Sequence, residues 1–200
     1  MAENSLMSSK YRFIEPDQNK KGVAVTVTLR LLSEKDSNAL LEFELENRQW
    51  FERFIAPREA SMLSSDGILE HIEFCLEEYE ERRLLPMVVV DSQGEILGRI
   101  NFHDVKFNQG QAALGYRFAE RACGKGLASK MIMEGIDTVR EIGFRRLVAV
   151  AAVDNLASQR VLEKCGFSQV ALVPNYVRLH GHYVDCFRYQ LNLRKLKKAV

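Results

Sequence analysis

The sequence predicts a mixed α/β fold, with a mostly antiparallel central sheet that contains one strand–helix–strand crossover. Three observations support this fold class. Segments rich in β-branched residues alternate with segments that carry apolar residues at helical spacing. Three strand-like segments follow one another through short turns, which makes them antiparallel neighbours. A helical segment then separates two further strand-like segments, as in a parallel crossover.

The first elements follow from local signals. Residues 1–22 are polar and lack periodicity, so we expect a tail or irregular lead-in before a single domain at 23–195. A strand is predicted over 23–32 (VAVTVTLRLL). Ser33 and Asp36 have the spacing of a capping box, which begins a first helix. A second helix is predicted from about residue 66 to residue 83.

The remaining elements complete the order. Strands are predicted within PMVVVD, EILGRINFHDV and AALGYRF, with turns at Gly94 and Gly110. A helix is expected over 127–142, with Gly143 as its C-cap. The next segment, RRLVAVAAV, is apolar on both faces, which is typical of a buried strand with a parallel neighbour. A short helix at 155–165 and strands near 168–172 and 183–193 follow, the strands flanking a predicted loop, VPNYVRLHGHY.

Composition excludes several classes of function. The 200 residues carry a net charge of +1, so no global field favours nucleic acid. The longest unbroken apolar run, 147–153, is too short for a membrane span, and the N-terminus lacks the pattern of a signal peptide. The four cysteines have no metal-ligand spacing, and His180 and His182 have no nearby third ligand. We therefore expect a reduced, cytoplasmic protein without a metal site.

A glycine loop precedes the helix at 127–142. In the stretch ERACGKGLASK, Gly124 and Gly126 leave the backbone N–H groups of a helix start open to an anion, and Arg121 and Lys125 add positive charge. The pattern fits neither a Walker loop, because Lys125 precedes the second glycine, nor a dinucleotide fingerprint, because the third glycine is replaced by Ser129. A phosphate-binding loop and a simple tight turn both remain open from this pattern alone.

Two motifs together resemble a known family. The stretch RACGKGLA resembles the R/Q-x-x-G-x-G/A signature of the GCN5-related N-acetyltransferases (GNAT), whose loop holds the pyrophosphate of coenzyme A. The stretch DNLASQRVLEKCGF is similar to a segment of the ribosomal-protein-alanine N-acetyltransferase (RimJ/RimL-like) branch. PNYVRLHGHYVDCFRYQL looks like the closing hairpin of that branch. The resemblance covers roughly residues 24–193.

The resemblance implies a GNAT fold and a cofactor site. Its fourth and fifth strands, here near 112–118 and 146–153, are parallel but splay apart, and helices cover both faces of the sheet. Acetyl-CoA is the implied co-substrate, without a metal. Asn155 also fits a helix N-cap, and both roles stay open. The implied cofactor contacts are Phe118, Ala119, Arg121, Gly124, Lys125, Gly126, Leu127, Ala128, Asn155 and Ser158.

The implied reaction is direct attack of an amine on the thioester. Many relatives place a glutamate base in the fourth or fifth strand, but the matching positions are Ala113 and Val150 or Ala151. Reaching the neutral form at pH 7 costs about 1.4 kcal/mol for an α-amine and about 4.6 kcal/mol for a lysine. The missing carboxylates therefore favour an α-amine acceptor. Glu120 and His103 are candidate proton relays.

The acid and the acceptor site are less constrained. In the ribosomal-protein branch a serine that matches Ser158 is assigned as the acid, and Tyr176 is a second candidate. The implied acceptor site includes Trp50, Phe54, His103 and Tyr176. The expected acceptor is a protein N-terminus, and a homodimer is the default oligomeric state. Two alternatives stay open: acetylation of a small-molecule amine, and a CoA-binding regulatory module without turnover.

Overall fold

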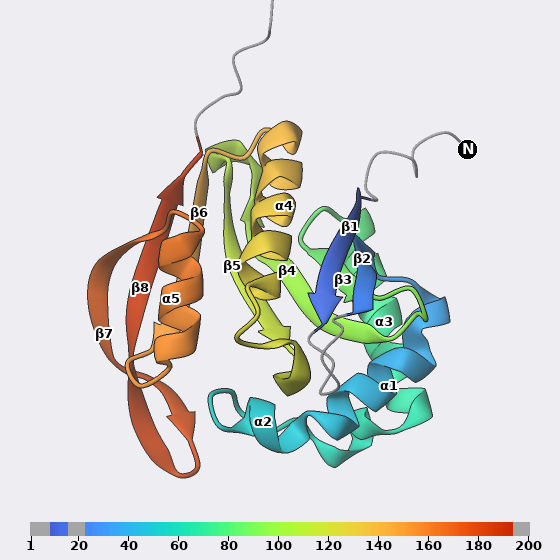
Figure 1. Ribbon diagram of the computed structural model, residues 1–200. Helices are drawn as coiled ribbons and strands as arrows, with labels where there is room; N and C mark the ends of the chain where they lie inside the picture. Colours follow the sequence, from blue (N-terminus) through green and yellow to red (C-terminus); the bar gives the residue numbers. More distant parts are fainter. Residues whose placement is uncertain (1–8, 16–22, 194–200) are drawn as a thin grey trace, which may run out of the picture.

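The computed structural model describes residues 9–15 and 23–193, and side chains from residue 26 to residue 193 (Figure 1). The described strands are β1 (Ser9–Glu15), β2 (Val23–Leu31), β3 (Leu85–Val90), β4 (Ile96–Lys106), β5 (Gln111–Phe118), β6 (Arg146–Ala152), β7 (Ser168–Leu179) and β8 (His182–Asn192). The described helices are α1 (Ser37–Glu46), α2 (Arg48–Glu52), α3 (Ser65–Glu80), α4 (Leu127–Ile142) and α5 (Leu156–Lys164). Short 3-10 helices are η1 (Glu34–Asp36), η2 (Ala60–Leu63), η3 (Phe107–Gln109) and η4 (Glu120–Ala122).

The eight described strands form one sheet in the order β1-β2-β3-β4-β5-β6-β8-β7. Neighbouring strands are antiparallel except β5 and β6, which are parallel. The β5–β6 register begins at Gln111 and Arg146 and ends at Ala113 and Val148. Beyond this point the two strands continue without pairing. The predicted mixed sheet with a splayed parallel pair is therefore confirmed.

Helices cover both faces of the sheet. In Figure 1, α4 and α5 lie on the near face of the sheet, and α3 lies behind it and packs against α1. Met131 and Ile132 of α4 are fully buried, as is Ile72 of α3. Burying each such side chain contributes about 1.5–3 kcal/mol. The sheet therefore separates two apolar layers, and each layer has its own neighbouring helices.

Local signals explain where the helices begin and end. The backbone N–H of Ser33 donates to the Asp36 carboxylate at 2.9 Å, and Arg30 makes two hydrogen bonds of 2.6 and 2.7 Å to that carboxylate. The predicted capping box therefore forms, and η1 leads into α1. Gly143 ends α4 with a φ of 108°, a left-handed conformation that glycine adopts without steric cost.

Two segments differ from the sequence-based expectation. Residues 9–15 form β1, which pairs with β2, so the prediction of an irregular lead-in over 1–22 is wrong there. The rest of that lead-in lies outside the described residues. The predicted loop between the last strands is also wrong, because β7 continues to Leu179 and only a tight turn at His180–Gly181 remains. In both cases a neighbouring strand supplies backbone partners that local sequence does not reveal.

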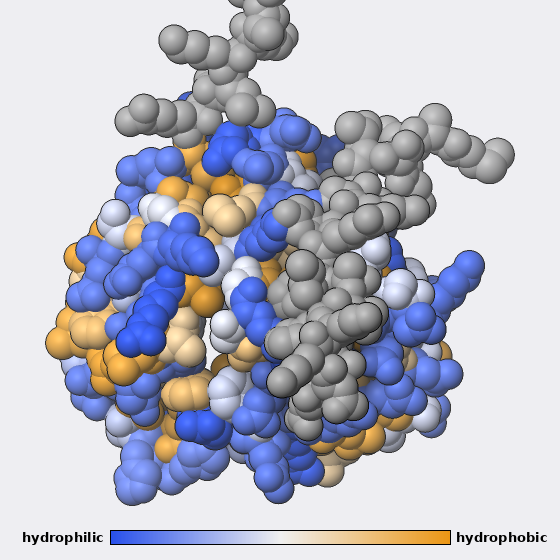
Figure 2. All heavy atoms as spheres, viewed as in Figure 1, coloured by the Kyte–Doolittle hydropathy of each residue, from blue (hydrophilic) through white to orange (hydrophobic). Residues whose placement is uncertain are grey.

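None of the helices in the described part of the chain is long and apolar enough to cross a membrane. Figure 2 shows hydrophobic residues at the surface on the side formed by β7 and β8. Val170 and Leu172 of β7 are more than half exposed. The edge strand therefore presents apolar side chains to solvent.

Candidate active site

The separation of β5 from β6 leaves one edge of β5 unpaired with its parallel neighbour. The amide of Ala119 donates to the carbonyl of Leu97 in β4 at 2.9 Å, and the carbonyl of Ala119 accepts from Ala122. Backbone groups of successive strand residues point to opposite edges, so those of Phe118 and Tyr116 face the split. The backbone N–H of Ala119 already has a partner in β4, so a contact of Ala119 with the cofactor stays a prediction.

A tyrosine and a serine meet across the split. The hydroxyl of Tyr116, from β5, lies 2.8 Å from Oγ of Ser158, in α5, and donates to the carbonyl of Ser158 at 3.1 Å. These contacts join β5 to α5, the helix that follows β6. The predicted residue Ser158 therefore lies at the split, and its hydroxyl is held by a second hydroxyl group.

Tyr116 is a functional candidate that sequence reasoning missed. Burial raises the pKa of its phenol well above the usual value, although the hydrogen bond to Ser158 opposes this shift. The phenol therefore stays protonated and can donate a hydrogen bond at neutral pH. Alternation along β5 was an available signal, because Leu114, Tyr116 and Phe118 share one face of the strand. The partner on α5 was not visible from the sequence.

The glycine loop forms an open helix start. Gly124 and Gly126 have φ values of 74° and 79°, and Gly126 is the N-cap residue of α4. A Cβ atom on Gly124 would meet nothing within 4 Å, and one on Gly126 would meet only Nζ of Lys164 at 4.0 Å. The space around the loop is therefore open, and backbone N–H groups at the start of α4 are accessible to an anion. These features fit a diphosphate.

The other predicted loop residues differ in their surroundings. Lys125 is exposed, Ala128 is half-buried, and Leu127 is buried in the core. Arg121 forms an exposed ion pair of 2.7 Å with Glu95, so a phosphate would compete with that carboxylate. The backbone N–H of Glu120 donates to Oδ1 of Asn47 at 3.0 Å, and Glu120 is exposed.

Asn155 caps the helix that carries Ser158. Its Oδ1 accepts a hydrogen bond of 3.0 Å from the backbone N–H of Ser158. The N-cap interpretation of Asn155 is therefore confirmed, while a cofactor contact stays a prediction. Because the cap fixes the first turn of α5, it also fixes the position of the Ser158 hydroxyl.

A groove lies on the opposite face of the sheet, at the point where β5 and β6 separate. Its volume is about 570 Å³. Ala113 and Val148, the last paired residues of the two strands, line it, together with His103 of β4 and Phe74 of α3. The groove therefore approaches the split from the side of α3, and the Tyr116–Ser158 pair lies on the side of α5.

Comparison with known proteins agrees with this geometry. A family model described as an acetyltransferase (GNAT) domain matches residues 26–168. The chain belongs to the GNAT acetyltransferase family. A relative from Bacillus subtilis strain 168, the probable N-acetyltransferase YjcK, is 26% identical over 167 residues, which cover 80% of this chain and 90% of the relative. The activity class is therefore that of an acyltransferase, as predicted.

Solved structures show the same fold. The ribosomal-protein-S5-alanine acetyltransferase from Vibrio fischeri superposes with a TM-score of 0.81 and 20% identity, over 86% of this chain and 95% of that one. The spermidine N-acetyltransferase from Vibrio cholerae, solved with CoA and spermine, superposes with a TM-score of 0.72 and 23% identity, over 84% and 96% of the two chains. A GNAT fold thus serves both protein and small-molecule acetyltransferases.

Three of the predicted acceptor residues of this GNAT protein, Trp50, Phe54 and His103, fall in two places. Trp50 and Phe54 flank the guanidinium of Arg53, at 5.1 and 5.5 Å from their ring centres. Nε2 of His180, at the β7–β8 turn, lies 2.7 Å from the carbonyl oxygen of Glu52 in α2. The hairpin therefore contacts the segment that carries both aromatic residues. His103 lies apart from them, in the groove beside α3.

Tyr176, the fourth predicted acceptor residue, lies on β7 and is half exposed. Asn175, next to it, has a φ of 53°, and its backbone N–H donates to the Asp185 carboxylate at 2.8 Å. This bond stabilises β7 where its register with β8 shifts, between Val173 and Val177. The role of Tyr176 stays a prediction.

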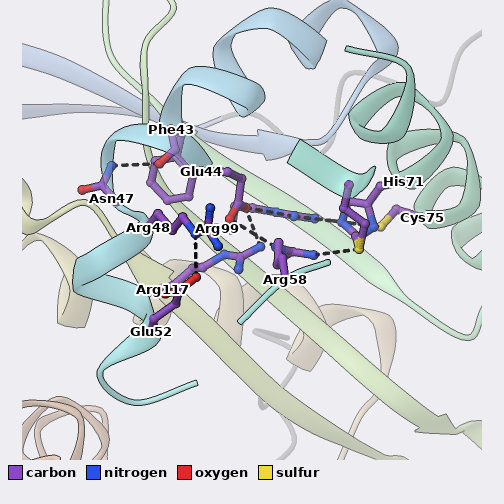
Figure 3. A network of polar contacts seen from close by, with 11 residues as sticks. Phe43, Glu44, Asn47, Arg48, Glu52, Arg58, His71, Cys75, Arg99 and Arg117 are labelled. Atoms are coloured by element: carbon purple, nitrogen blue, oxygen red, sulfur yellow. Dashed lines mark hydrogen bonds and ion pairs between the residues drawn. The ribbon is translucent and has the colours of Figure 1, made fainter. Parts of the chain in front are cut away.

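A buried charged cluster lies on the α1 and α3 face of the sheet (Figure 3). Glu44 of α1 is 3% exposed and forms ion pairs of 2.6 Å with Arg117 and 3.2 Å with Arg58. Arg99, which is 2% exposed, lies 3.7 Å from Glu44 and 3.0 Å from Nε2 of His71. One carboxylate therefore faces three guanidinium groups.

Burial and the neighbouring positive charges lower the pKa of two members of this cluster. Burial, followed by the charges of the three arginines, lowers the pKa of His71 to about 3. Burial likewise lowers the pKa of Arg117 to about 9, although Glu44 opposes this shift. His71 is therefore neutral near pH 7, and its Nε2 can accept from Arg99. No local sequence pattern predicts this cluster, since its members come from α1, α3, β4, β5 and a loop.

Proposed function

We propose that this GNAT protein transfers the acetyl group of acetyl-CoA to the N-terminal α-amine of a protein. The main support for the proposal is that the glycine loop and the unpaired edge of β5 follow one another in space. The open glycine loop lies at the start of α4, and the unpaired edge of β5 leads away from it toward Ser158. A diphosphate and an extended pantetheine arm fit these two features in turn.

Each part of the cofactor has proposed partners in this chain. Gly124, Gly126 and the first turn of α4, with Lys125, would hold the diphosphate. The backbone groups of Phe118 and Tyr116 would bind the pantetheine amides as a neighbouring strand does. One of these N–H groups would also stabilise the oxyanion of the tetrahedral intermediate.

The reaction is a direct transfer. The amine nitrogen forms a bond to the thioester carbon, the C–S bond breaks, and the CoA thiolate leaves with the bonding electron pair. The pair of hydroxyl groups at Ser158 and Tyr116 would hydrogen-bond the sulfur and supply the proton that the thiolate takes up. The proton lost by the amine goes to a base or to water.

The absence of a carboxylate at the strand positions where many relatives carry one supports an α-amine acceptor. Ala113 lines the groove at the split, where many relatives carry a glutamate, and Val150 and Ala151 occupy the matching positions of β6. An α-amine loses its proton about 3 kcal/mol more easily than a lysine at pH 7. A site without a strong base therefore suits an α-amine better than a lysine side chain.

Acetylation of a small amine is the second candidate. The groove of about 570 Å³ has the size of a small-molecule site, and the fold superposes on a spermidine acetyltransferase. Peptides and small amines therefore compete as acceptors in the decisive experiment.

The experiment measures thiol release from acetyl-CoA with a panel of peptides bearing free N-termini, matched N-blocked peptides with lysines, and small amines. We expect turnover with free N-termini and about tenfold less with blocked ones. If only polyamines or amino acids were acetylated, and no peptide, the protein N-terminus would be ruled out as the acceptor. Acetyl-CoA is also expected to raise the melting temperature, because it binds the folded state. No stabilisation would overturn the cofactor site itself.

A further inference from the structure

We propose that His103 is the general base of this acetyltransferase and that Asp104 is its positioning residue. The inference rests on the proposed function and supplies what that function lacks, a group that takes the proton of the acceptor amine. Two observations support the inference: the imidazole of His103 lies in the groove, and an irregular stretch of backbone brings the carboxylate of Asp104 close to that imidazole.

The imidazole lies where the reaction would occur. His103 pairs with Ala113 across β4 and β5, on the face that lines the groove. A Cβ atom on Gly115 would lie 3.4 Å from Nε2 of His103. Gly115 follows the last residue of β5 that pairs with β6 by two positions, so the ring nitrogen lies over the part of β5 that is not paired with β6. The glycine leaves room there for an approaching amine.

The backbone between His103 and Lys106 is irregular. The β4–β5 register shifts between these residues, and Asp104 has a φ of 49°. Successive side chains of a regular strand point to opposite faces, so Asp104 would point away from His103. The irregularity instead brings Oδ2 of Asp104 to 3.1 Å from Nδ1 of His103. A strained conformation that joins two titratable side chains at a groove is typical of a functional site.

The contact sets the proton on one ring nitrogen. With the carboxylate at Nδ1, the favoured neutral tautomer carries its proton there, and Nε2 has a free electron pair. As the amine attacks the thioester, Nε2 accepts one proton from the amine nitrogen. The imidazolium is stabilised by Asp104, and then passes the proton to water. The side chain of His103 is 45% exposed, which leaves a route for that water.

The other charged groups of the groove are Glu78, Arg83, Asp104 and Lys106. Glu78 is the competing base, but it accepts hydrogen bonds of 2.7 and 2.9 Å from Arg83. These bonds lower the pKa of the Glu78 carboxyl, which makes it a poorer proton acceptor. Lys106 and Arg83 are cations and cannot act as bases near pH 7. His103 is therefore the group in the groove best suited to this step.

The test compares pH–rate profiles of the full-length wild type, H103Q, D104N and E78Q, with the best peptide acceptor from the panel. We expect H103Q to lower kcat at pH 7 by about tenfold or more, as removal of a general base does. The deficit narrows above about pH 9, where an α-amine is already neutral. D104N keeps a residue that tolerates left-handed backbone and gives a smaller loss with a shifted profile.

Controls separate this proposal from the proposed function. Stabilisation by acetyl-CoA should be equal in the wild type and all three variants, which shows that the fold and cofactor site persist. Unchanged kcat in H103Q, a deficit that is the same at every pH, or a larger loss in E78Q than in H103Q would overturn the base assignment while the acetyl transfer stands. A wild type that releases no thiol with any amine would overturn the proposed function, and the base assignment with it.

Discussion

The two faces of the sheet hold polar groups in opposite ways. On the α5 face, two neutral hydroxyl groups, Tyr116 and Ser158, meet across the split at 2.8 Å. On the α1 and α3 face, Glu44 is buried among three arginines. A neutral pair can be removed with little loss of folding energy, whereas a buried charge without its partner is costly. The hydroxyl pair is therefore suited to a role in the reaction, whereas the buried ion cluster mainly stabilises the fold, apart from the groove that holds His103 on the same face.

The largest effect is expected from Glu44→Gln. This change removes the carboxylate that faces the arginines, and it should lower the free energy of unfolding by about 3–5 kcal/mol. Urea denaturation followed by circular dichroism measures it. The matched control is Glu52→Gln, which removes the partner of Arg48 in an exposed ion pair and should cost less than about 1 kcal/mol. Equal losses would remove the contrast between buried and exposed pairs.

His71 should make the same face sensitive to acid. Its pKa is lowered from 6.5 to about 3 in the folded protein, so between these pH values the unfolded chain binds a proton that the folded chain does not bind. Its contribution to stability is complete above pH 6.5 and is lost as the pH falls toward 3. The loss amounts to about 2 kcal/mol at pH 5.

The His71→Gln variant tests this dependence. Glutamine keeps an acceptor for Arg99 but does not titrate, so the fall in melting temperature between pH 7 and pH 5 should become smaller. The same substitution at His182, which is exposed, should leave the fall in melting temperature between pH 7 and pH 5 as in the wild type. An unchanged slope in His71→Gln would show that the acid sensitivity arises elsewhere.

On the cofactor side, Gly126→Ala should weaken acetyl-CoA binding by about tenfold. A Cβ atom at a φ of 79° costs about 1–2 kcal/mol and stands at the start of α4. Isothermal titration calorimetry gives the affinity. Gly143→Ala, at the other end of α4 with a φ of 108°, carries a similar backbone cost and should leave the affinity unchanged. Equal affinities in both variants would contradict the loop as the diphosphate site.

The smallest effect concerns the hydroxyl pair. Tyr116→Phe and Ser158→Ala should each lower kcat by about threefold to tenfold, with acetyl-CoA affinity within about twofold of the wild type. Because the two groups touch, the double variant should lose less than the product of the single losses. A loss in the double variant equal to the product of the single losses would mean that the two hydroxyl groups act separately. An unchanged kcat in both single variants would remove both groups from the mechanism.

Much of the fold was predictable from local signals. The capping box at Ser33 and Asp36, the glycine that ends α4, and the apolar run of β6 each predicted an element that the structure contains. Strand β1 was not predicted, because its pairing with β2 depends on a partner that its own residues do not specify. The extension of β7 to Leu179 escaped prediction for the same reason.

The amino-acid sequence alone was enough to indicate the family, and it predicts residues of the cofactor site, because the glycine loop and the segment around Ser158 are continuous motifs. The contacts between residues far apart in the chain follow only from the folded structure. Tyr116 reaches Ser158 over 42 positions of chain, Glu44 joins arginines from three segments, and a shifted register brings Asp104 to His103. Such contacts depend on the packing of strands and helices, and no local pattern encodes them.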